Sequence, residues 1–185
     1  TKHRDPRYFD AVMHLAVDAQ DHWVETIKAW IDEHNPTGEN EVMPDATIVA
    51  VVQSDNNESE IKNFEVPPPV WSNEEQKSAW IEGLRTLCAL PDSLFTIIVT
   101  SAWIADGEGA EICMEKQIPV RDLPEHMRED FVLVHMSCAR GDRLIMFANQ
   151  AESEITDTGV LDSESLGGDF ALLFPPIPSH TTPHN

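Results

Sequence analysis

Few residues in this chain combine the type and spacing that catalysis requires. His135, Cys138 and Arg143 suggest a phosphatase-like loop, in which a cysteine thiolate attacks phosphorus and an arginine holds the phosphate oxygens. However, Cys138 and Arg143 stand one residue closer than in such a loop. His135 and Cys138 also fall on opposite sides of an expected strand, because side chains alternate along a strand. We therefore expect no cysteine-based catalysis.

A second candidate is a metal site on an expected helix. His14, Asp18 and His22 recur every four residues and so share one side of that helix. The two histidines are about 12 Å apart along the helix axis, since each residue adds about 1.5 Å. That distance is too long for both imidazoles to bind one ion. We expect a solvated polar surface rather than a metal site.

Other short motifs have simpler structural explanations. Arg140-Gly141-Asp142 spells an integrin-recognition tripeptide, but it stands between two strand-like runs and predicts a hairpin turn. Gly167-Gly168-Asp169-Phe170 resembles a diguanylate cyclase signature without its following glutamate. Phosphate-binding, dinucleotide-binding, serine-nucleophile and zinc-protease motifs are missing. We assign no catalytic, cofactor-binding or metal-binding residue and no cofactor, and the sequence favours a protein that is not an enzyme.

The charge of the chain restricts its partners. Acidic residues number 33 against 12 basic residues, which gives a net charge of -21. Direct binding to nucleic-acid phosphates needs lysine and arginine, and anionic membranes repel the same surface, so we expect neither. The acidity itself has three explanations: solubility, adaptation to high salt, and mimicry of a nucleic acid that occupies a basic groove of another protein.

The cysteines and the hydropathy pattern bear on location. Cys88, Cys113 and Cys138 form no close pair, which predicts buried, reduced thiols rather than a disulfide framework or a zinc knuckle. No apolar run reaches the length of a membrane span, and residues 1–6 lack the apolar stretch of a secretion signal. We expect a cytoplasmic protein.

Two helices follow from the apolar periodicity. Residues 6–33 repeat apolar side chains every three or four positions, after Asp5 as a cap, although Gln20 interrupts the stripe. The stripe favours packing against a core, with a helix-mediated dimer as the alternative. Ser72, with Glu75 three residues later, predicts the start of a second helix that ends before Pro91.

Strand-like runs supply the rest of the fold. They span residues 47–53, 94–104, 110–116, 131–139 and 143–150, with short additions at 155–161 and 170–174. Between the first run and the second helix, Pro67-Pro68-Pro69-Val70-Trp71 predicts an extended spacer, or a polyproline ligand for a partner. The sequence thus predicts one α+β domain over residues 1–185, with a mainly antiparallel sheet of about five strands packed against two helices and a proline-rich tail at 175–185.

Residues 94–150 carry one family resemblance. A strand that ends in Val99-Thr100-Ser101-Ala102-Trp103-Ile104, followed by the hairpin that begins at Phe131, resembles a group of uncharacterised prokaryotic and phage-encoded α+β proteins. The acid that separates the serine from the alanine in that group is absent here. The resemblance implies a shared fold core and a phage or mobile-element origin, and it carries no activity.

Together these observations favour a non-enzymatic interaction or accessory protein that binds a protein partner or a second copy of itself. Two alternatives come from other classes. A nucleic-acid mimic would gather its acids on one side of the fold, and an enzyme with carboxylate chemistry would need a pocket in which two or more acids converge.

Overall fold

The structure is a computed structural model that describes residues 5–38, 48–54, 61–66, 72–162, 173–175 and 177, with the backbone alone for 48–54 and 61–66. The described residues form three α-helices, two short 3-10 helices and six strands. In chain order these are α1 (Pro6–His34), β1 (Ile48–Ser54), β2 (Ile61–Val66), α2 (Glu74–Cys88), β3 (Ser93–Ala105), α3 (Gly107–Lys116), η1 (Val120–Asp122), η2 (Glu125–Met127), β4 (Arg128–Cys138), β5 (Gly141–Ala148) and β6 (Thr156–Asp157).

The strands form one sheet in the order β2-β1-β3-β4-β5-β6, and every neighbouring pair is antiparallel. The predicted α+β class with a mainly antiparallel sheet is confirmed. The sheet has six strands rather than about five. β2 lies directly before Pro67, in a stretch that the sequence did not mark as a strand. The two residues of β6 fall within the predicted addition at 155–161.

The predicted strand at 110–116 is wrong, because these residues belong to helix α3. Asp106 lies directly before this helix and caps it. Its side chain accepts a hydrogen bond of 2.6 Å from the backbone N–H of Gly109. At the other end Gln117 adopts a left-handed conformation that stops the helix. The capping geometry decides the structure of this short segment, whose apolar residues do not alternate.

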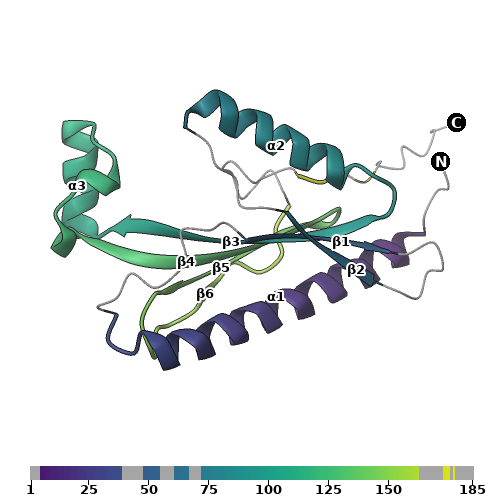
Figure 1. The fold of residues 1–185 in the computed structure, drawn as a ribbon, viewed down its shortest axis with the longest axis horizontal. Coiled ribbons are helices and arrows are strands. Elements are labelled where there is room, and N and C mark those ends of the chain that lie inside the picture. Colours follow the sequence, from purple (N-terminus) through teal and green to yellow (C-terminus); the bar gives the residue numbers. More distant parts are fainter. Residues whose placement is uncertain are drawn as a thin grey trace, which may run out of the picture.

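Two helices cover the two sides of the sheet (Figure 1). The predicted first helix is confirmed, with Asp5 as the cap and Asn35 directly after its end. Its apolar stripe packs on one side of the sheet, here called the α1 side. The main core lies there and includes Ala16, Ile31, Val99, Val134, Met136 and Phe147.

Helix α2 covers the opposite side, here called the α2 side. A smaller core on this side joins Ile81, Leu84 and Cys88 of the helix to Ile98 of β3. The helix begins one residue later than predicted, because Asn73 rather than Ser72 is its cap. The Asn73 side chain accepts a hydrogen bond of 2.9 Å from the Gln76 backbone N–H. The Gln76 side chain in turn accepts a bond of 2.8 Å from the Ser72 N–H.

The predicted hairpin around Arg140 is confirmed as β4 and β5. Gly141 begins β5 with φ of +147°, a conformation that side chains disfavour, and a Cβ atom there would approach the Leu161 carbonyl oxygen to 2.1 Å. Near the other end of the chain, Leu173 and Phe174 pack into the smaller core. These two residues lie in no strand, so that end of the predicted strand at 170–174 is wrong; their side chains fill the core ahead of Pro175 without extending the sheet.

Several predictions fall on other parts of the chain. Residues 67–71, residues 163–172 and most of the tail at 175–185 lie outside the described residues. Among the helices that the structure describes, none combines the length and the apolar character needed to cross a membrane.

Beyond the part covered by the helices, β3 and β4 continue as a two-stranded extension. The last pair of β1 with β3 involves Val99, and the last pair of β5 with β4 involves Phe131. From Ser101 to Ala105, β3 is therefore paired with β4 alone among the described strands. Helix α3 and the two 3-10 helices close the far end (Figure 1). We call residues 101–130 the arm.

Candidate functional site

A buried group of polar side chains lies on the α2 side of the sheet. Thr96, Ser137 and Asp142 are direct neighbours across β3, β4 and β5, and His135 lies two residues before Ser137 on the same side. Thr96 is fully buried, and Ser137 and Asp142 are each 1% exposed. Serine, histidine and aspartate together are the residue types of a nucleophilic triad, so their geometry needs a close comparison with one.

That geometry differs from a catalytic triad. The Ser137 hydroxyl donates its hydrogen bond to Asp142 Oδ1 rather than to histidine. His135 Nε2 lies 3.3 Å from Asp142 Oδ1 and 3.4 Å from Ser137 Oγ, so both partners are on the same ring nitrogen. In a triad the carboxylate and the serine occupy opposite nitrogens, which allows the ring to pass a proton between them. The group is a buried polar network and offers no activated serine.

Two atoms in this network are left without a hydrogen bond. Among the described residues, neither Thr96 Oγ1 nor Asp142 Oδ2 has a partner. A buried polar atom without a partner costs about 1 to 3 kcal/mol, and more if it carries charge. The network is therefore a weak point of an otherwise apolar core.

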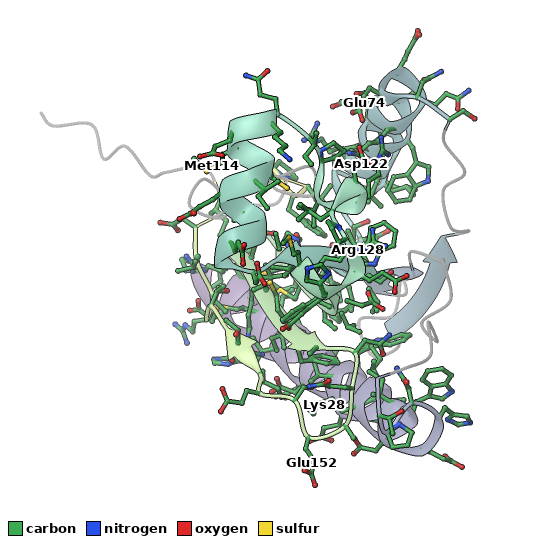
Figure 2. All side chains as sticks on the ribbon, turned by 90° about the vertical axis from the view of Figure 1, so that its left-hand side faces the viewer. Lys28, Glu74, Met114, Asp122, Arg128 and Glu152 are labelled. Atoms are coloured by element: carbon green, nitrogen blue, oxygen red, sulfur yellow. The ribbon has the colours of Figure 1, made fainter. Side chains whose placement is uncertain are left out.

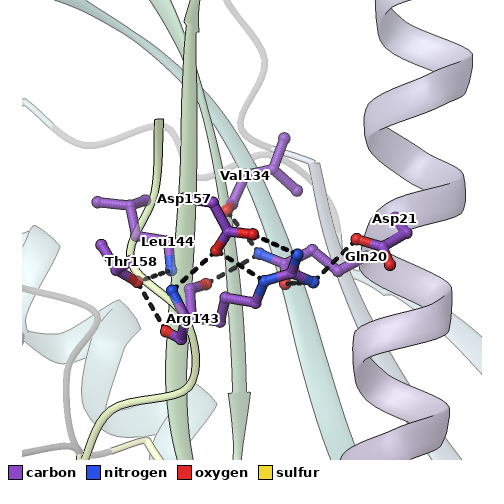
Figure 3. A network of polar contacts seen from close by, with 8 residues as sticks. Gln20, Asp21, Val134, Arg143, Leu144, Asp157 and Thr158 are labelled. Atoms are coloured by element: carbon purple, nitrogen blue, oxygen red, sulfur yellow. Dashed lines mark hydrogen bonds and ion pairs between the residues drawn. The ribbon is translucent and has the colours of Figure 1, made fainter. Parts of the chain in front are cut away.

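A second polar network holds helix α1 against the edge of the sheet (Figure 3). Arg143 Nε and Nη2 donate to the two carboxylate oxygens of Asp157 at 2.9 and 2.6 Å, and Nη1 donates to Asp21 at 2.8 Å. The Gln20 amide donates to the backbone oxygens of Val134 and Arg143, both at 2.9 Å. Gln20 is fully buried, so this apparent interruption of the apolar stripe is a polar link to β4 and β5.

The charges of this second network are fixed by their partners. The hydrogen bond with Asp157 raises the pKa of the Arg143 guanidinium, and the bond to Asp21 acts in the same direction. The same arginine lowers the pKa of the Asp157 carboxyl below its usual 3.8. Because its N–H groups already bind carboxylates, Arg143 is not free to hold a phosphate, as the phosphatase-like motif would require.

Cys88 and Cys138 are poor nucleophiles in this fold. Cys88 and Cys138 are buried, Cys113 is half-buried on α3, and all three are free thiols. Burial raises the pKa of Cys88 to about 12 and also raises the pKa of Cys138. Thiols in that state stay protonated at neutral pH and do not attack substrates. Cys138 lies on the α1 side of β4 and His135 on the other, as the alternation predicted.

The histidines of α1 lie on its outer surface. His14, Asp18 and His22 are all exposed, in the solvated arrangement that the spacing favoured. The described part of the chain contains no group of three or more His, Cys, Asp or Glu side chains placed to hold a metal ion.

The arm presents the largest exposed aromatic residue that the structure describes. Trp103 is 44% exposed on the α1 side of β3, beyond the part of the sheet that packs on α1. The Arg128 guanidinium lies over its ring, 4.5 Å from the ring centroid. Asp130 pairs with Trp103 across the ribbon, and Ser101 and Ala105 flank it on β3. We call these residues, Ser101, Trp103, Ala105, Arg128 and Asp130, the Trp103 face.

The end of helix α1 adjoins this face through a short chain of hydrogen bonds. The Asn35 side chain donates to the Asn149 carbonyl at 2.9 Å, and the Asn149 side chain donates to Asp130 Oδ2 at 2.9 Å. These bonds fix the orientation of the Asp130 carboxylate. The Asp130 carboxylate of the Trp103 face is thus held by hydrogen bonds, while Trp103 stays 44% exposed.

The sequence had assigned no residue of this face a role, and Trp103 entered only as part of the family resemblance. Its place on the strand gave one signal. Trp103 shares the parity of Ile97 and Val99, so alternation along the strand places its side chain on the same side as the main core. What the periodicity did not show is that α1 ends before reaching it.

Comparison with protein-family models, with curated proteins and with solved structures finds no match to this chain. The function must therefore be inferred from the residues themselves.

Proposed function

We propose that this chain is a non-enzymatic interaction protein that binds a protein partner through the Trp103 face. The observation that carries the proposal is a tryptophan that is 44% exposed and held in place by a stacked arginine, on an arm outside the packed core. Tryptophan is strongly over-represented among the residues that dominate binding energies, because a fixed aromatic ring buries a large area at little entropic cost.

The polar residues whose types are most suited to catalysis are buried or already paired, which supports the same proposal. Ser137 and Asp142 are each only 1% exposed, which leaves a substrate no direct route to them. Arg143 is occupied by Asp21 and Asp157. The exposed surface with a distinctive composition is the Trp103 face on the arm.

Nucleic-acid mimicry finds less support in the described residues. The exposed acids of α1 and of α2 lie on opposite sides of the sheet rather than in one row. Glu74 on α2 and Glu152 after β5 lie at opposite ends of the molecule when it is viewed from the α3 end (Figure 2). A cytoplasmic location fits the three free thiols and belongs to the proposal. A phage or mobile-element origin stays a prediction from the family resemblance.

The proposal is tested by selecting peptides from a random display library against the purified full chain and against Trp103→Ala. We expect peptides that bind the wild-type chain and lose at least about tenfold in affinity on the variant, which corresponds to about 1.4 kcal/mol. Met114→Ala is the matched control. Met114 is 80% exposed and also lies on the arm, but on helix α3, away from Arg128 (Figure 2).

Binding should survive the Met114 substitution. Peptides that bind wild type and Trp103→Ala equally well, or a selection that yields no binder, would contradict the proposal. If the partner is a second copy of the chain, sedimentation of the wild type will show concentration-dependent assembly that Trp103→Ala abolishes.

A further inference from the structure

We infer that the partner presents a basic segment, in which lysine or arginine side chains accompany an apolar anchor. The inference rests on the proposed function and specifies the chemistry of the partner at the Trp103 face. Its main support is electrostatic complementarity, because an acidic surface around an apolar centre attracts a basic partner and repels an acidic one.

The charge of the arm is strongly unbalanced. Residues 101–130 contain eight acidic and three basic side chains. Two of the basic side chains already have internal partners: Arg121 lies 3.9 Å from Asp122, and Arg128 is stacked on Trp103. Five glutamates of the arm are exposed and have no ion-pair partner among the described residues: Glu108, Glu111, Glu115, Glu125 and Glu129.

The charges beside Trp103 itself are mixed, with the Arg128 guanidinium over the ring and the Asp130 carboxylate opposite it on the neighbouring strand. Asp130 is the direct partner of Trp103 across the ribbon, and its Oδ1 accepts no hydrogen bond among the described contacts. The C-terminal end of α1, joined to Asp130 through Asn35 and Asn149, contributes the negative end of a helix dipole. Asp32 and Glu33 are exposed in its last turn. A cation that approaches Trp103 from the side of β4 therefore meets the Asp130 carboxylate.

The face already holds one cation of this type. The guanidinium of Arg128 lies over the Trp103 ring, and it also donates to the Arg121 carbonyl oxygen. Indole rings attract cations through the negative charge of their faces. A partner arginine or lysine would use the same attraction together with the Asp130 carboxylate, while an apolar neighbour in the partner would cover the exposed part of the ring.

The inference is tested with the same random peptide library and the full chain, with selection at about 0.05 M and about 0.5 M salt. We expect the Trp103-dependent peptides to be enriched in lysine and arginine. Their affinity should fall at least about fivefold at the higher salt, because exposed charges are screened there.

A charge variant separates the basic component from the aromatic one. Asp130→Asn keeps an oxygen that accepts from the Asn149 side chain, so the face should stay folded, while binding of the basic peptides should weaken about three- to tenfold. Glu75→Gln removes one exposed carboxylate on α2 and should leave binding unchanged. Circular dichroism and thermal unfolding of each variant confirm that the fold is intact.

The outcomes distinguish the two proposals. Trp103-dependent peptides that are neutral or acidic, or whose binding ignores salt and Asp130→Asn, would overturn the basic partner and leave the interaction surface standing. A selection without any Trp103-dependent peptide would overturn both.

Discussion

The inner halves of strands β3 and β4, between the two helices, and their outer halves, on the arm, have opposite surroundings. On the inner half, β3 is buried continuously from Leu94 to Val99, because α1 covers one side and α2 the other. On the outer half the same strand exposes 44% of Trp103. An apolar residue at a core-like position is structural where a helix covers it, and it is available for binding where the helix has ended.

The largest expected effect concerns the inner half. Phe147 is fully buried in the core on the α1 side, with the Lys28 ammonium 5.1 Å from its ring centroid. Phe147→Ala should lower the free energy of unfolding by about 3 to 5 kcal/mol, because it removes apolar contacts and leaves a cavity. Urea unfolding of the wild type and the variant measures this loss of free energy. A loss of under about 1 kcal/mol would mean that the helices do not cover the inner half as tightly as its burial indicates.

The next effect concerns the attachment of α1 to the inner half. Gln20→Leu removes both hydrogen bonds from the side chain to the Val134 and Arg143 backbone oxygens. We expect a loss of about 2 kcal/mol in the same unfolding experiment. Thr26→Val is a control on the exposed side of α1 that removes a hydroxyl bonded only to the preceding turn, and it should have little effect. An equal loss in both variants would show that the buried Gln20 amide contributes no more to stability than the exposed Thr26 hydroxyl.

The inner half shows how much the sequence could predict. Helix α1, its cap at Asp5 and the β4–β5 hairpin follow from local patterns, and the structure contains them. The role of Gln20 was hidden because its acceptors lie more than 100 residues away in the chain. The polar neighbours Thr96, Ser137 and Asp142 were hidden for the same reason, since the register across three strands brings them together.

The outer half was harder to predict because two local signals compete there. Asp106 and Gly107 are typical of a hairpin turn, and the same aspartate is typical of a helix cap. The hydrogen bond from the Gly109 N–H to Asp106 selects the helix. The exposure of Trp103 depends in turn on where α1 ends, which no pattern around Trp103 itself records.

A smaller effect of opposite sign is expected in the buried polar network of the inner half. Asp142 is 1% exposed, and its Oδ2 has no partner among the described residues. Asp142→Asn keeps an oxygen that accepts from the Ser137 hydroxyl and removes an ionisable group from the core. We expect the free energy of unfolding at neutral pH to rise by about 1 kcal/mol.

Ser137→Ala is the companion variant. It withdraws the hydroxyl that donates to Asp142 and should be destabilising. A fall of about 2 kcal/mol or more in Asp142→Asn would instead indicate that the carboxylate is stabilised by its neighbours, including His135 Nε2 at 3.3 Å.

The ion pair between Arg143 and Asp157 should have a still smaller effect on stability, and this effect should depend on pH. Arg143 lowers the pKa of the Asp157 carboxyl from 3.8, so the pair stabilises the folded state fully above that pH. The contribution is lost as pH falls through the lower folded-state pKa. Asp157 is 40% exposed, which limits the effect to under about 1 kcal/mol.

The measurement compares wild type with Asp157→Asn in urea unfolding. The wild type should be slightly more stable at about pH 6, and the difference should close as pH falls from 3.8 through the lower folded-state pKa of Asp157. A difference that stays constant over this range would mean that the Asp157 charge is not what Arg143 recognises.

The smallest effect on stability is expected at Trp103, the residue with the largest expected effect on binding. Trp103→Ala removes a bigger side chain than Phe147→Ala, yet it should cost less than about 1 kcal/mol, since nearly half of the ring is exposed and its main polar contact is one arginine. Residues that stabilise a fold lose stability and binding together when they are replaced. A residue kept exposed for a partner loses binding alone, and Trp103→Phe should recover part of it because the stacking surface returns. If Trp103→Ala unfolds the protein as readily as Phe147→Ala, the arm is held together by its tryptophan, and the difference between the two halves of the strands disappears.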